Sequence, residues 1–294
     1  MTNRILVVGS INTDLVTFVE RMPEAGETVP ARDFAKLPGG KGANQAVAAA
    51  RLGGDVILAG RVGRDAFGRD ALASLAEAGV NTQHIAISEG MSSGVATILV
   101  EPSGENRIFI VAGANGQVVS TDVPDSLLAE AALLVLQLEI PLDAIYDLIA
   151  RAIAAGVSVL LNPAPAVELD FDRLRGLDYL IPNQGELALL TGMNVAGTDA
   201  VVAAARRLVR RGIGTVITTL GADGALLVTA TRVAHVEAPK VVPVDTTGAG
   251  DAFIGCFAQT LVATNDVDTA LARAVRYAAD TVTRKGAQAS YQKS

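Results

Sequence analysis

Short apolar runs rich in β-branched residues alternate along the chain with longer Ala-rich stretches. The short runs predict strands at residues 5–8, 56–59, 133–138, 157–161, 179–182, 216–219 and 225–228. The longer stretches predict helices at residues 43–52, 67–78, 143–155, 186–191, 199–211, 252–264 and 268–283. Strands that are apolar on both faces and alternate with helices are typical of a parallel sheet covered by helices on both sides. We therefore predict an α/β fold of three layers, α/β/α, with a mainly parallel central sheet.

Two segments interrupt this alternation and predict a small separate β-sheet. Residues 27–37 alternate apolar and polar side chains, and the runs at 95–100 and 107–111 flank a turn sequence, PSGEN, at 102–106. Such an insert commonly forms a lid over a substrate, and a decorated edge of the main sheet is the alternative. The predicted division is a main domain of residues 1–13, 38–93 and 112–294 and a discontinuous lid of residues 14–37 and 94–111.

Composition and charge narrow the classes of function. The 294 residues include 24 basic and 31 acidic side chains, and the net charge of −7 without a basic run argues against general nucleic-acid binding. No apolar run reaches the roughly 18 residues of a membrane helix, and the start of the chain lacks a signal-peptide pattern. His84 and His235 are isolated, which predicts no zinc site. Cys256 is the only cysteine, so we expect a cytoplasmic protein without disulfides.

The most informative segment is a Gly-rich turn at residues 244–250, which ends in Asp251 and runs into an apolar helix. The start of a helix carries unpaired N–H groups and partial positive charge, so it attracts anions. Gly248 and Gly250 let the backbone approach a phosphate closely. Asp251 follows directly, and an exposed Asp with a pKa of about 3.9 is ionised at neutral pH. An anion site beside a base predicts phosphoryl transfer to a hydroxyl.

A second Gly-rich segment, PGGKGANQ at residues 38–45, precedes another predicted helix. It is not a Walker A loop, because the spacing G-x-x-x-x-G-K-[ST] is absent. Gly40 and Gly42 allow close approach to a small ligand, while Lys41 and Asn44 offer hydrogen-bond donors. A turn that caps the helix explains the segment equally well.

Polar side chains also follow several predicted strands. Asn12 and Asp14 follow the first strand, and Glu139 follows the third, where they could bind the hydroxyls of a polyol. The G-x-G-x-x-G pattern is absent, which weakens a dinucleotide-binding hypothesis. An ordinary Asx turn explains Asn12 and Asp14 as well.

Two further segments have both a structural and a functional explanation. Asn183 and Glu186 could hold Mg²⁺ through water, or Asn183 could simply cap a helix whose first turn contains Glu186. Residues 219–224 join two strands, either as a hairpin turn only or as a contact with phosphate and nucleotide.

In this order and combination, the motifs closely resemble the ribokinase branch of the phosphofructokinase-B carbohydrate kinase family. The turn at 245–251 marks the wider family, and the runs at 9–14, 39–50, 162–166 and 282–288 are similar to the ribokinase branch. The resemblance extends from residue 5 to about residue 290. It implies a ribokinase-like fold with a lid and ATP-dependent phosphorylation of the primary hydroxyl of a sugar. For ribose the reaction gives ribose 5-phosphate by transfer to O5.

The resemblance also implies the roles of individual residues. Asp251 would be the base, and the anion hole would consist of Gly248, Ala249 and Gly250. The sugar would contact Asn12, Asp14, Gly40, Lys41, Gly42, Asn44, Glu139 and Asp251. ATP would contact Asn183, Thr219, Leu220, Gly221, Ala222, Asp223, Gly224 and Gly250, with Glu186 near Mg²⁺. An activating K⁺ would lie among Asp245, Thr247, Thr281, Arg284, Gly286 and Ser290. Dimerisation through the lid sheets is a further expectation of the resemblance.

Other functions remain open at this stage. A sibling kinase would act on deoxyribose, a ketose or a nucleoside. A catalytically silent sugar-binding regulator could use the same fold, but the intact Asp251 and the anion-hole glycines argue against it. A Rossmann dehydrogenase is disfavoured by the missing glycine pattern.

Overall fold

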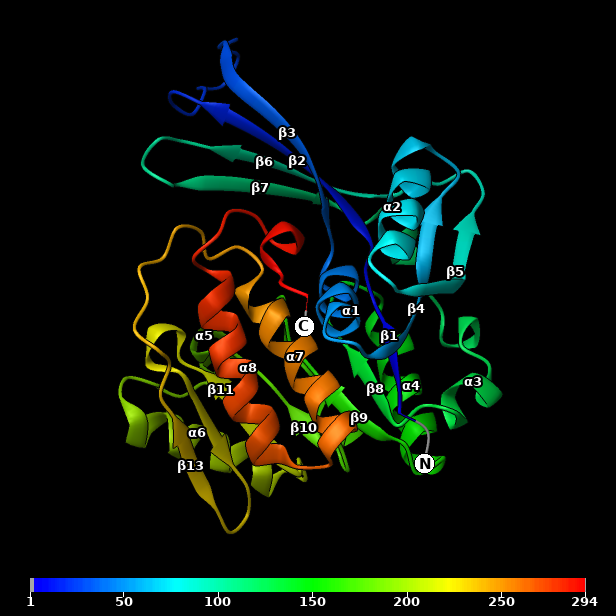
Figure 1. Ribbon diagram of the computed structural model, residues 1–294, viewed down its shortest axis with the longest axis vertical. Helices are drawn as coiled ribbons and strands as arrows, with labels where there is room; N and C mark the ends of the chain where they lie inside the picture. Colours follow the sequence, from blue (N-terminus) through cyan, green and yellow to red (C-terminus); the bar gives the residue numbers. More distant parts are fainter. Residues whose placement is uncertain (1–2, 294) are drawn as a thin grey trace.

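The computed structural model describes residues 3–293 and consists of a large sheet between helices and a small separate sheet (Figure 1). The strands of the large sheet lie in the order β13-β12-β11-β10-β9-β8-β1-β4-β5. Their bounds are β1 Arg4–Val8, β4 Asp55–Gly63, β5 Asn81–Ser88, β8 Leu133–Leu136, β9 Ser158–Leu161, β10 Tyr179–Leu180, β11 Thr215–Thr219, β12 Ala225–Val228 and β13 Val233–Val236. Neighbours from β5 to β11 are parallel, and only β12 and β13 run antiparallel at one edge. The predicted mainly parallel sheet is confirmed.

Helices cover both faces of this sheet. Their bounds are α1 Lys41–Arg51, α2 Ala66–Glu77, α3 Asp125–Ala129, α4 Leu142–Ala154, α5 Gln184–Thr191, α6 Thr198–Arg210, α7 Ala249–Thr264 and α8 Val267–Thr281. One buried apolar cluster joins α1, α7 and α8 to the sheet, and a second joins α4 and α6 to the opposite face. Figure 1 shows α1, α7 and α8 in front of the strands and α4 and α6 behind them. The three layers follow the prediction because apolar residues occupy both faces of the central strands.

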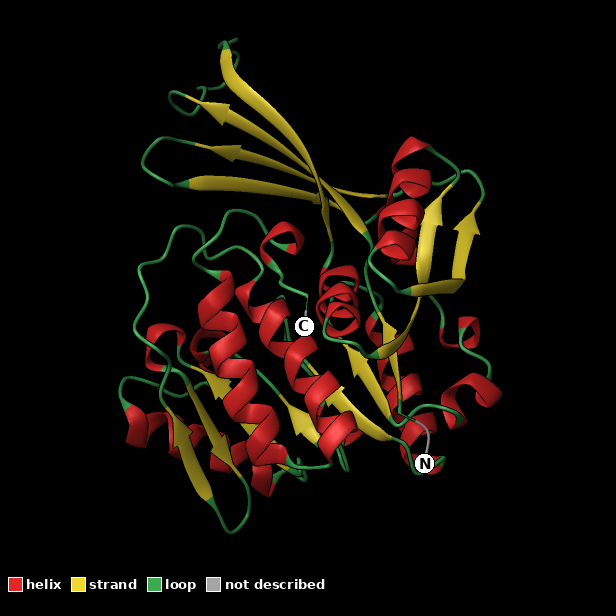
Figure 2. Ribbon diagram, in the orientation of Figure 1, coloured by secondary structure: helices red, strands yellow, loops and turns green. Residues whose placement is uncertain are grey.

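The small sheet projects from one end of the molecule (Figure 2). Its strands lie in the order β3-β2-β6-β7, with bounds β3 Ala31–Gly39, β2 Asn12–Val19, β6 Gly94–Val100 and β7 Asn106–Val111. The strand β2 pairs antiparallel with β3 and parallel with β6. Asn12 pairs with Gly39 at the base of the sheet, directly before α1. The small sheet is therefore anchored where the Gly-rich segment enters its helix.

Some elements differ from the predictions. The sequence patterns missed β2, β5, β13 and α3. The strands β5 and β13 form the two edges of the large sheet, and because they are only half-buried they mix polar with apolar residues. Helix α7 begins at Ala249 rather than at residue 252, since Gly and Asp are poor helix formers that propensity places outside. The predicted anion turn is thus partly the first turn of α7.

Helices α1 and α7 touch through their backbones at Gly255. A Cβ atom added to Gly255 would lie 2.5 Å from Ala48 Cβ and 2.6 Å from the Gln45 carbonyl oxygen. Real Cβ atoms essentially never come this close to other atoms, so α7 needs a residue without a side chain here. This close approach brings Asn44 and Gln45 of α1 beside Asp251 of α7.

Within residues 3–293, no helix has the length and apolar character that crossing a bilayer requires.

Candidate active site

A cleft of about 230 Å³ lies beyond the carboxyl ends of the central parallel strands. It collects predicted site residues from distant parts of the chain, namely Lys41, Asn183, Glu186, Thr219, Gly248, Gly250 and Asp251. Ligands of open α/β sheets bind at this edge. The fold therefore unites residues that the sequence suggested only as separate motifs.

Asp251 lies in the first turn of α7 at the bottom of this cleft. Its Oδ2 accepts a hydrogen bond from Asn44 Nδ2 and its Oδ1 accepts one from Gln45 Nε2, both at 2.9 Å. Only 7% of the residue is exposed. Burial raises the pKa of Asp251 above its ordinary value, while Lys41 and the two amide donors oppose that rise. The expectation of an exposed carboxylate was wrong, because α1 packs over it.

The turn before Asp251 is shaped by Gly248, which caps α7. Gly248 has a φ of 75°, in the left-handed region, and an added Cβ would lie 2.6 Å from Ala287 Cβ. Gly250 differs, since a Cβ there would meet no protein atom within 4 Å. Because Gly250 lines the cleft, the space that its missing side chain leaves is open to a ligand. The amide of Ala249 already donates to the Thr246 carbonyl oxygen at 3.3 Å.

Side chains that follow β1 and β8 meet the start of α1 next to this cleft. Ser10 Oγ donates to Glu139 Oε2, which also accepts the Lys41 backbone N–H at 3.0 Å. On β2, Asn12 Oδ1 accepts a hydrogen bond from Asn115 Nδ2 at 2.7 Å. These contacts draw the predicted sugar-binding segments into one polar region.

Three carboxylates share this region. Burial, together with the negative charges of Glu139 and Asp251, raises the pKa of Asp14 to about 6. Such coupling requires the carboxylates to lie near one another. The structure thus brings together Asp14, Glu139 and Asp251, as one sugar site would need.

The Gly-rich segment before α1 also caps this helix. Gly40 is the N-cap residue, with a φ of 90°, and no side chain caps the helix there. Gly42 is buried in the first turn. The segment therefore does cap α1, as the structural explanation predicts. The same segment also places Lys41 at the wall of the cleft.

Asn183 and Glu186 form the predicted helix cap and also line the cleft. Asn183 Oδ1 accepts the Glu186 N–H, and Glu186 Oε2 accepts the Asn183 N–H, both at 2.8 Å. Burial raises the pKa of Glu186. Nowhere among the described residues do three His, Cys, Asp or Glu side chains form a metal-binding group.

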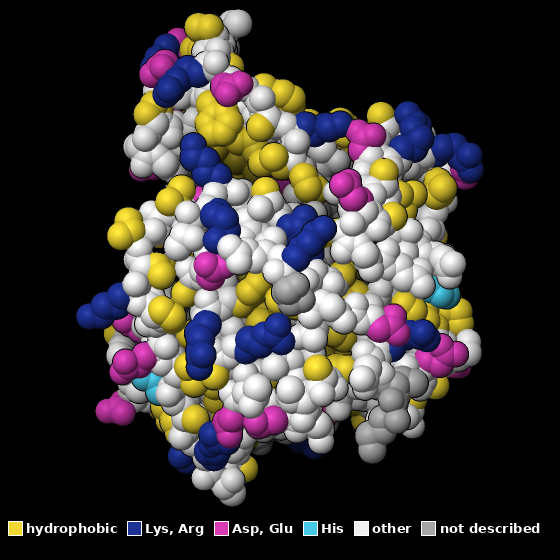
Figure 3. Space-filling model, in the orientation of Figure 1, with side chains coloured by type: hydrophobic (Ala, Val, Ile, Leu, Met, Phe, Trp, Pro, Cys, Tyr) yellow, Lys and Arg dark blue, Asp and Glu magenta, His cyan; other side chains and the backbone are white. Residues whose placement is uncertain are grey.

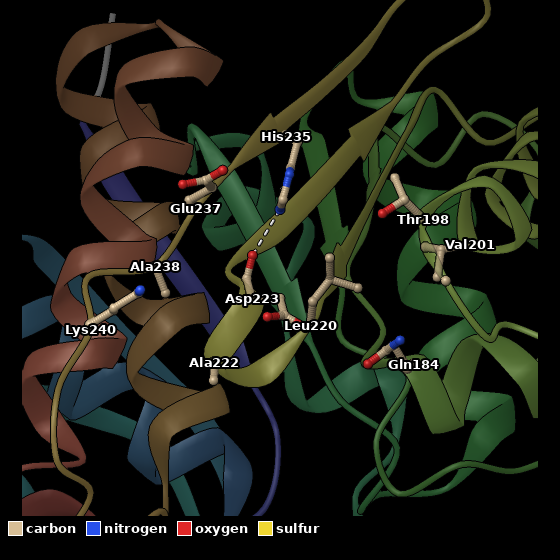
Figure 4. A pocket seen from close by; sticks show the side chains of 11 residues that line it. Gln184, Thr198, Val201, Leu220, Ala222, Asp223, His235, Glu237, Ala238 and Lys240 are labelled. Atoms are coloured by element: carbon tan, nitrogen blue, oxygen red, sulfur yellow. Dashed lines mark hydrogen bonds between the residues drawn. The ribbon is translucent and has the colours of Figure 1, made fainter.

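A second cavity of about 320 Å³ adjoins the cleft (Figure 4). Leu220, Ala222 and Asp223 of the predicted nucleotide segment line it. The two cavities are neighbours, since Thr219 lines the cleft and the next residue, Leu220, lines the second cavity. Gly221 and Gly224 are not lining residues; they shape the turn between β11 and β12, where Leu220 N–H donates to the Gly224 carbonyl at 2.8 Å.

His235 also lines the second cavity. It lies on the edge strand β13, as expected for a strand-edge histidine, and its Nε2 is 2.8 Å from the Asp223 carbonyl oxygen (Figure 4). The other lining residues include Gln184, Thr198 and Glu237. Sequence patterns gave no signal for these residues, which come from three different elements or loops.

Of the residues predicted around K⁺, Asp245 is joined by direct hydrogen bonds to Thr247 and Gly286, and Arg284 to Ser290. Asp245 Oδ1 accepts the Thr247 N–H at 2.9 Å, and Oδ2 accepts the Gly286 N–H at 2.8 Å. Arg284 Nε donates to the Ser290 carbonyl oxygen at 3.0 Å, so this oxygen already has a partner. The hydroxyl of Thr281 donates to the carbonyl of the preceding helical turn. Asp245 is thus the negatively charged centre of this group.

Sequence reasoning missed several buried amides around Asp251. Gln45, Gln137, Asn162 and Gln288 are all at most 9% exposed. Gln45, Gln137 and Asn162 share one signal, an amide inside or directly after an otherwise apolar element, where burial is costly unless the amide is hydrogen-bonded, whereas Gln288 has no such signal.

Comparisons with known proteins agree with the predicted resemblance. A family model described as pfkB family carbohydrate kinase matches residues 2–294. A deoxyribokinase of Salmonella typhi is 45% identical over 290 residues, covering 98% of this chain and 95% of that protein. A ribokinase of Schizosaccharomyces pombe is 43% identical over 298 residues, covering 97% of this chain and 94% of that protein. The structure of Arabidopsis thaliana ribokinase complexed with ribose and ATP matches with a TM-score of 0.93 and 31% identity, covering 99% of this chain and 96% of that one.

The raised pKa of Asp14 predicts how stability depends on pH without ligand. Because the folded protein favours the protonated carboxyl, stability falls as pH rises from about 4, the unfolded value, through about 6, the folded value. Asp14→Asn stays neutral and should escape this loss. Its thermal midpoint should exceed that of the unmodified protein increasingly above pH 4. The gain in the free energy of unfolding should approach roughly 1–3 kcal/mol at pH 8, since a shift of one pKa unit corresponds to about 1.4 kcal/mol.

Thermal unfolding between pH 4 and 8 measures this difference. Asp33→Asn, an exposed carboxylate on β3, is the matched control and should show no such trend. A constant difference between Asp14→Asn and the unmodified protein at every pH would contradict the prediction.

Proposed function

Since this chain belongs to the pfkB family of carbohydrate kinases, we propose that it transfers the γ-phosphoryl group of ATP to O5 of D-ribose. Membership of the family makes it a sugar kinase that phosphorylates a hydroxyl. The finer proposal, a pentose as acceptor, is supported by relatives named ribokinase and deoxyribokinase along nearly the whole chain.

The observation that carries the proposal is the position of Asp251. Asp251 lines one cleft with Lys41 and Gly250, where a missing side chain leaves open space, and it is close enough to Asp14 and Glu139 for their charges to act on one another. A phosphoryl group at the start of α7 and a sugar among the carboxylates would meet at this side chain.

The proposed step is an in-line transfer. Asp251 accepts the proton of the sugar hydroxyl as its oxygen attacks the γ-phosphorus, and the bond from phosphorus to the bridging oxygen of ADP breaks. A carboxylate whose pKa burial has raised is a stronger proton acceptor at neutral pH than an exposed one. N–H groups in the first turn of α7 would stabilise the charge on the transferred group.

The nucleotide would occupy both cavities. Its phosphates would lie in the cleft near Asn183 and Thr219, and its base in the second cavity beside Leu220 and Asp223. Glu186 would hold Mg²⁺ through water, and the ion would supply positive charge to the phosphates. Each carboxylate oxygen of Glu186 accepts one hydrogen bond from Asn183. Its second lone pair is left to accept a hydrogen bond from water.

A second candidate acceptor is 2-deoxy-D-ribose. It is favoured by the 45% identity to a protein named deoxyribokinase, against 43% to one named ribokinase.

A coupled assay for ADP formation over a panel of sugars tests the function. We expect ATP consumption with D-ribose, 2-deoxy-D-ribose or both, and little with hexoses or nucleosides. If the site hydrogen-bonds the 2-hydroxyl, kcat/KM for the deoxy sugar falls by up to roughly 10⁴-fold, and if not the two values are similar.

Asp251→Asn should lower kcat roughly 10²–10⁴-fold, whereas Asp172→Asn, an exposed carboxylate, should not. No activity with any pentose, or a fully active Asp251→Asn, would contradict the proposal.

We further propose activation by K⁺. Hydrogen bonds from Asp245 to Thr247 and to Gly286 join the loop after α8 to the segment that leads into Gly248. A cation in this group would fix the N–H groups of the turn, and preorganised donors can each contribute about 2.7–4 kcal/mol in the transition state. The initial rate should rise with KCl when a tetramethylammonium salt keeps the ionic strength constant. Asp245→Ala should abolish the response, and a flat curve for K⁺-free protein would contradict it.

A homodimer formed through the small sheets is also proposed. Phe34, Phe109 and Ile110 are 59%, 60% and 56% exposed on strands of this sheet, and Figure 3 shows hydrophobic side chains gathered over it. Apolar groups of this kind mark interaction surfaces. Sedimentation should give a dimer that Ile110→Lys dissociates, whereas Asn106→Lys, an exposed polar position on the same strand, should not. A monomer at all concentrations would contradict it.

We also propose a lid domain and a cytoplasmic location. The small sheet supports a division into a main domain and a lid at residues 14–37 and 94–111. A cytoplasmic location rests on the single cysteine, Cys256, which is buried and free. Restriction of the protein to the cytoplasmic fraction would be the corresponding measurement.

A further inference from the structure

Two amides hold the carboxylate of Asp251 from the same turn of α1. Asn44 and Gln45 are consecutive, and each donates to a different oxygen of Asp251 at 2.9 Å. All three residues are almost fully buried. Each oxygen of the carboxylate therefore has its own neutral amide donor.

Each of these amides is oriented by a second amide. Gln137 Nε2 donates to Gln45 Oε1 at 2.7 Å, and Gln288 Nε2 donates to Asn44 Oδ1 at 2.9 Å. A carboxamide presents a donor on one side and an acceptor on the other. Once its oxygen is engaged, its NH₂ group must face Asp251. If Gln45 turned over, two oxygens would face each other at Asp251 and two NH₂ groups at Gln137.

The outer amides come from distant parts of the fold. Gln137 directly follows β8, and Gln288 begins the short 3₁₀ helix η5, Gln288–Ser290. Gln45 also donates to Asn162 Oδ1 at 3.1 Å, and Asn162 follows β9, the neighbour of β8. Arg51 of α1 donates to the carbonyl oxygens of Gln288 and Tyr291, which fixes η5 against α1. Neither Gln137 nor Gln288 hydrogen-bonds Asp251 itself.

We propose that Gln137 and Gln288 are positioning residues of the phosphoryl transfer, which act through Gln45 and Asn44 to keep Asp251 ionised and correctly oriented. The inference rests on the proposed role of Asp251 as the base. A hydrogen bond to the charged form favours that form, so a disordered donor should raise the pKa of the base.

Several charged or titratable groups also act on Asp251. Lys41 of α1 is the cation, and Asp14 of β2, Glu139 after β8 and Glu186 of α5 are the carboxylates. The buried phenol of Tyr291, after η5, is the fifth group. The Met variants and the Thr260→Val control described next leave all of these groups in place.

The test compares Gln137→Met and Gln288→Met, which keep the side-chain length but lose the amide. The acid limb of kcat/KM for the pentose should move to higher pH by roughly half to one unit. The rate should fall more on the acid limb than at pH 9, while KM for ATP stays constant. Thr260→Val is the matched control, because Thr260 is buried on α7 without a link to these amides. It should lower the thermal midpoint without moving the limb.

Two further variants separate the outcomes. The series is repeated in an Asp14→Asn background, because Asp14, with a pKa of about 6, is a second carboxylate that could shape the acid limb. Asp251→Asn is measured beside it, and if it keeps full activity the proposed function fails at the base. If Asp251→Asn is inactive but both Met variants retain the original limb, only the present inference fails. If Gln137→Met does not fold, the result for Gln288→Met decides.

Discussion

The close contact between α1 and α7 at Gly255 is the constraint on which the active-site region depends. Only a residue without a side chain lets the two backbones approach this closely. Asn44 and Gln45 can then reach Asp251 over a normal hydrogen-bond distance. If the helices stood further apart, a buried carboxylate would lose its donors, and an unpaired buried charge is far more costly than a lost contact. The close packing of α1 and α7 is therefore also what gives the buried carboxylate of Asp251 its hydrogen-bond donors.

The region around Asp251 departs from what folding alone would favour. Burial raises the pKa values of Asp14, Asp251 and Glu186, so the ionised forms of all three are disfavoured by the fold. Lys41 is the cation that opposes this around Asp251 and Glu186. A ligand rich in hydroxyl donors would also stabilise the ionised carboxylates, since it supplies hydrogen bonds to groups that burial has removed from water. Binding and stability are in this way coupled through desolvation.

Much of the fold follows from the sequence, because central strands that are apolar on both faces have a clear pattern. The strands that were missed, β2, β5 and β13, lie in the small sheet or at the edges of the large one, where half-exposed positions weaken the pattern. The start of α7 was misplaced because intrinsic propensity excludes glycine, whereas the cap geometry at Gly248 decides where the helix begins.

Candidate site residues could be predicted where they lie close together in the sequence and form a motif, as from Gly248 to Asp251 and from Gly40 to Asn44. The burial of Asp251 was not predictable, since it depends on a helix some two hundred residues away in sequence. The amides behind it were missed for the same reason. Gln137 and Gln288 have no neighbours in sequence that reveal a role, and only the tertiary structure joins them to Gln45 and Asn44.

The position of η5 has a consequence for the order of folding. Gln288 and Asn44 are 244 residues apart in sequence, yet one hydrogen bond joins them. Tyr291 likewise donates from its hydroxyl to the Gly248 carbonyl at 3.0 Å. Contacts between such distant segments form after local ones, because the closure of a long loop costs entropy. During synthesis α1 is complete long before residues 288–291 leave the ribosome. The contacts of residues 288–291 with Asn44 and Gly248 therefore cannot form before nearly the whole sequence from α1 to η5 has been made.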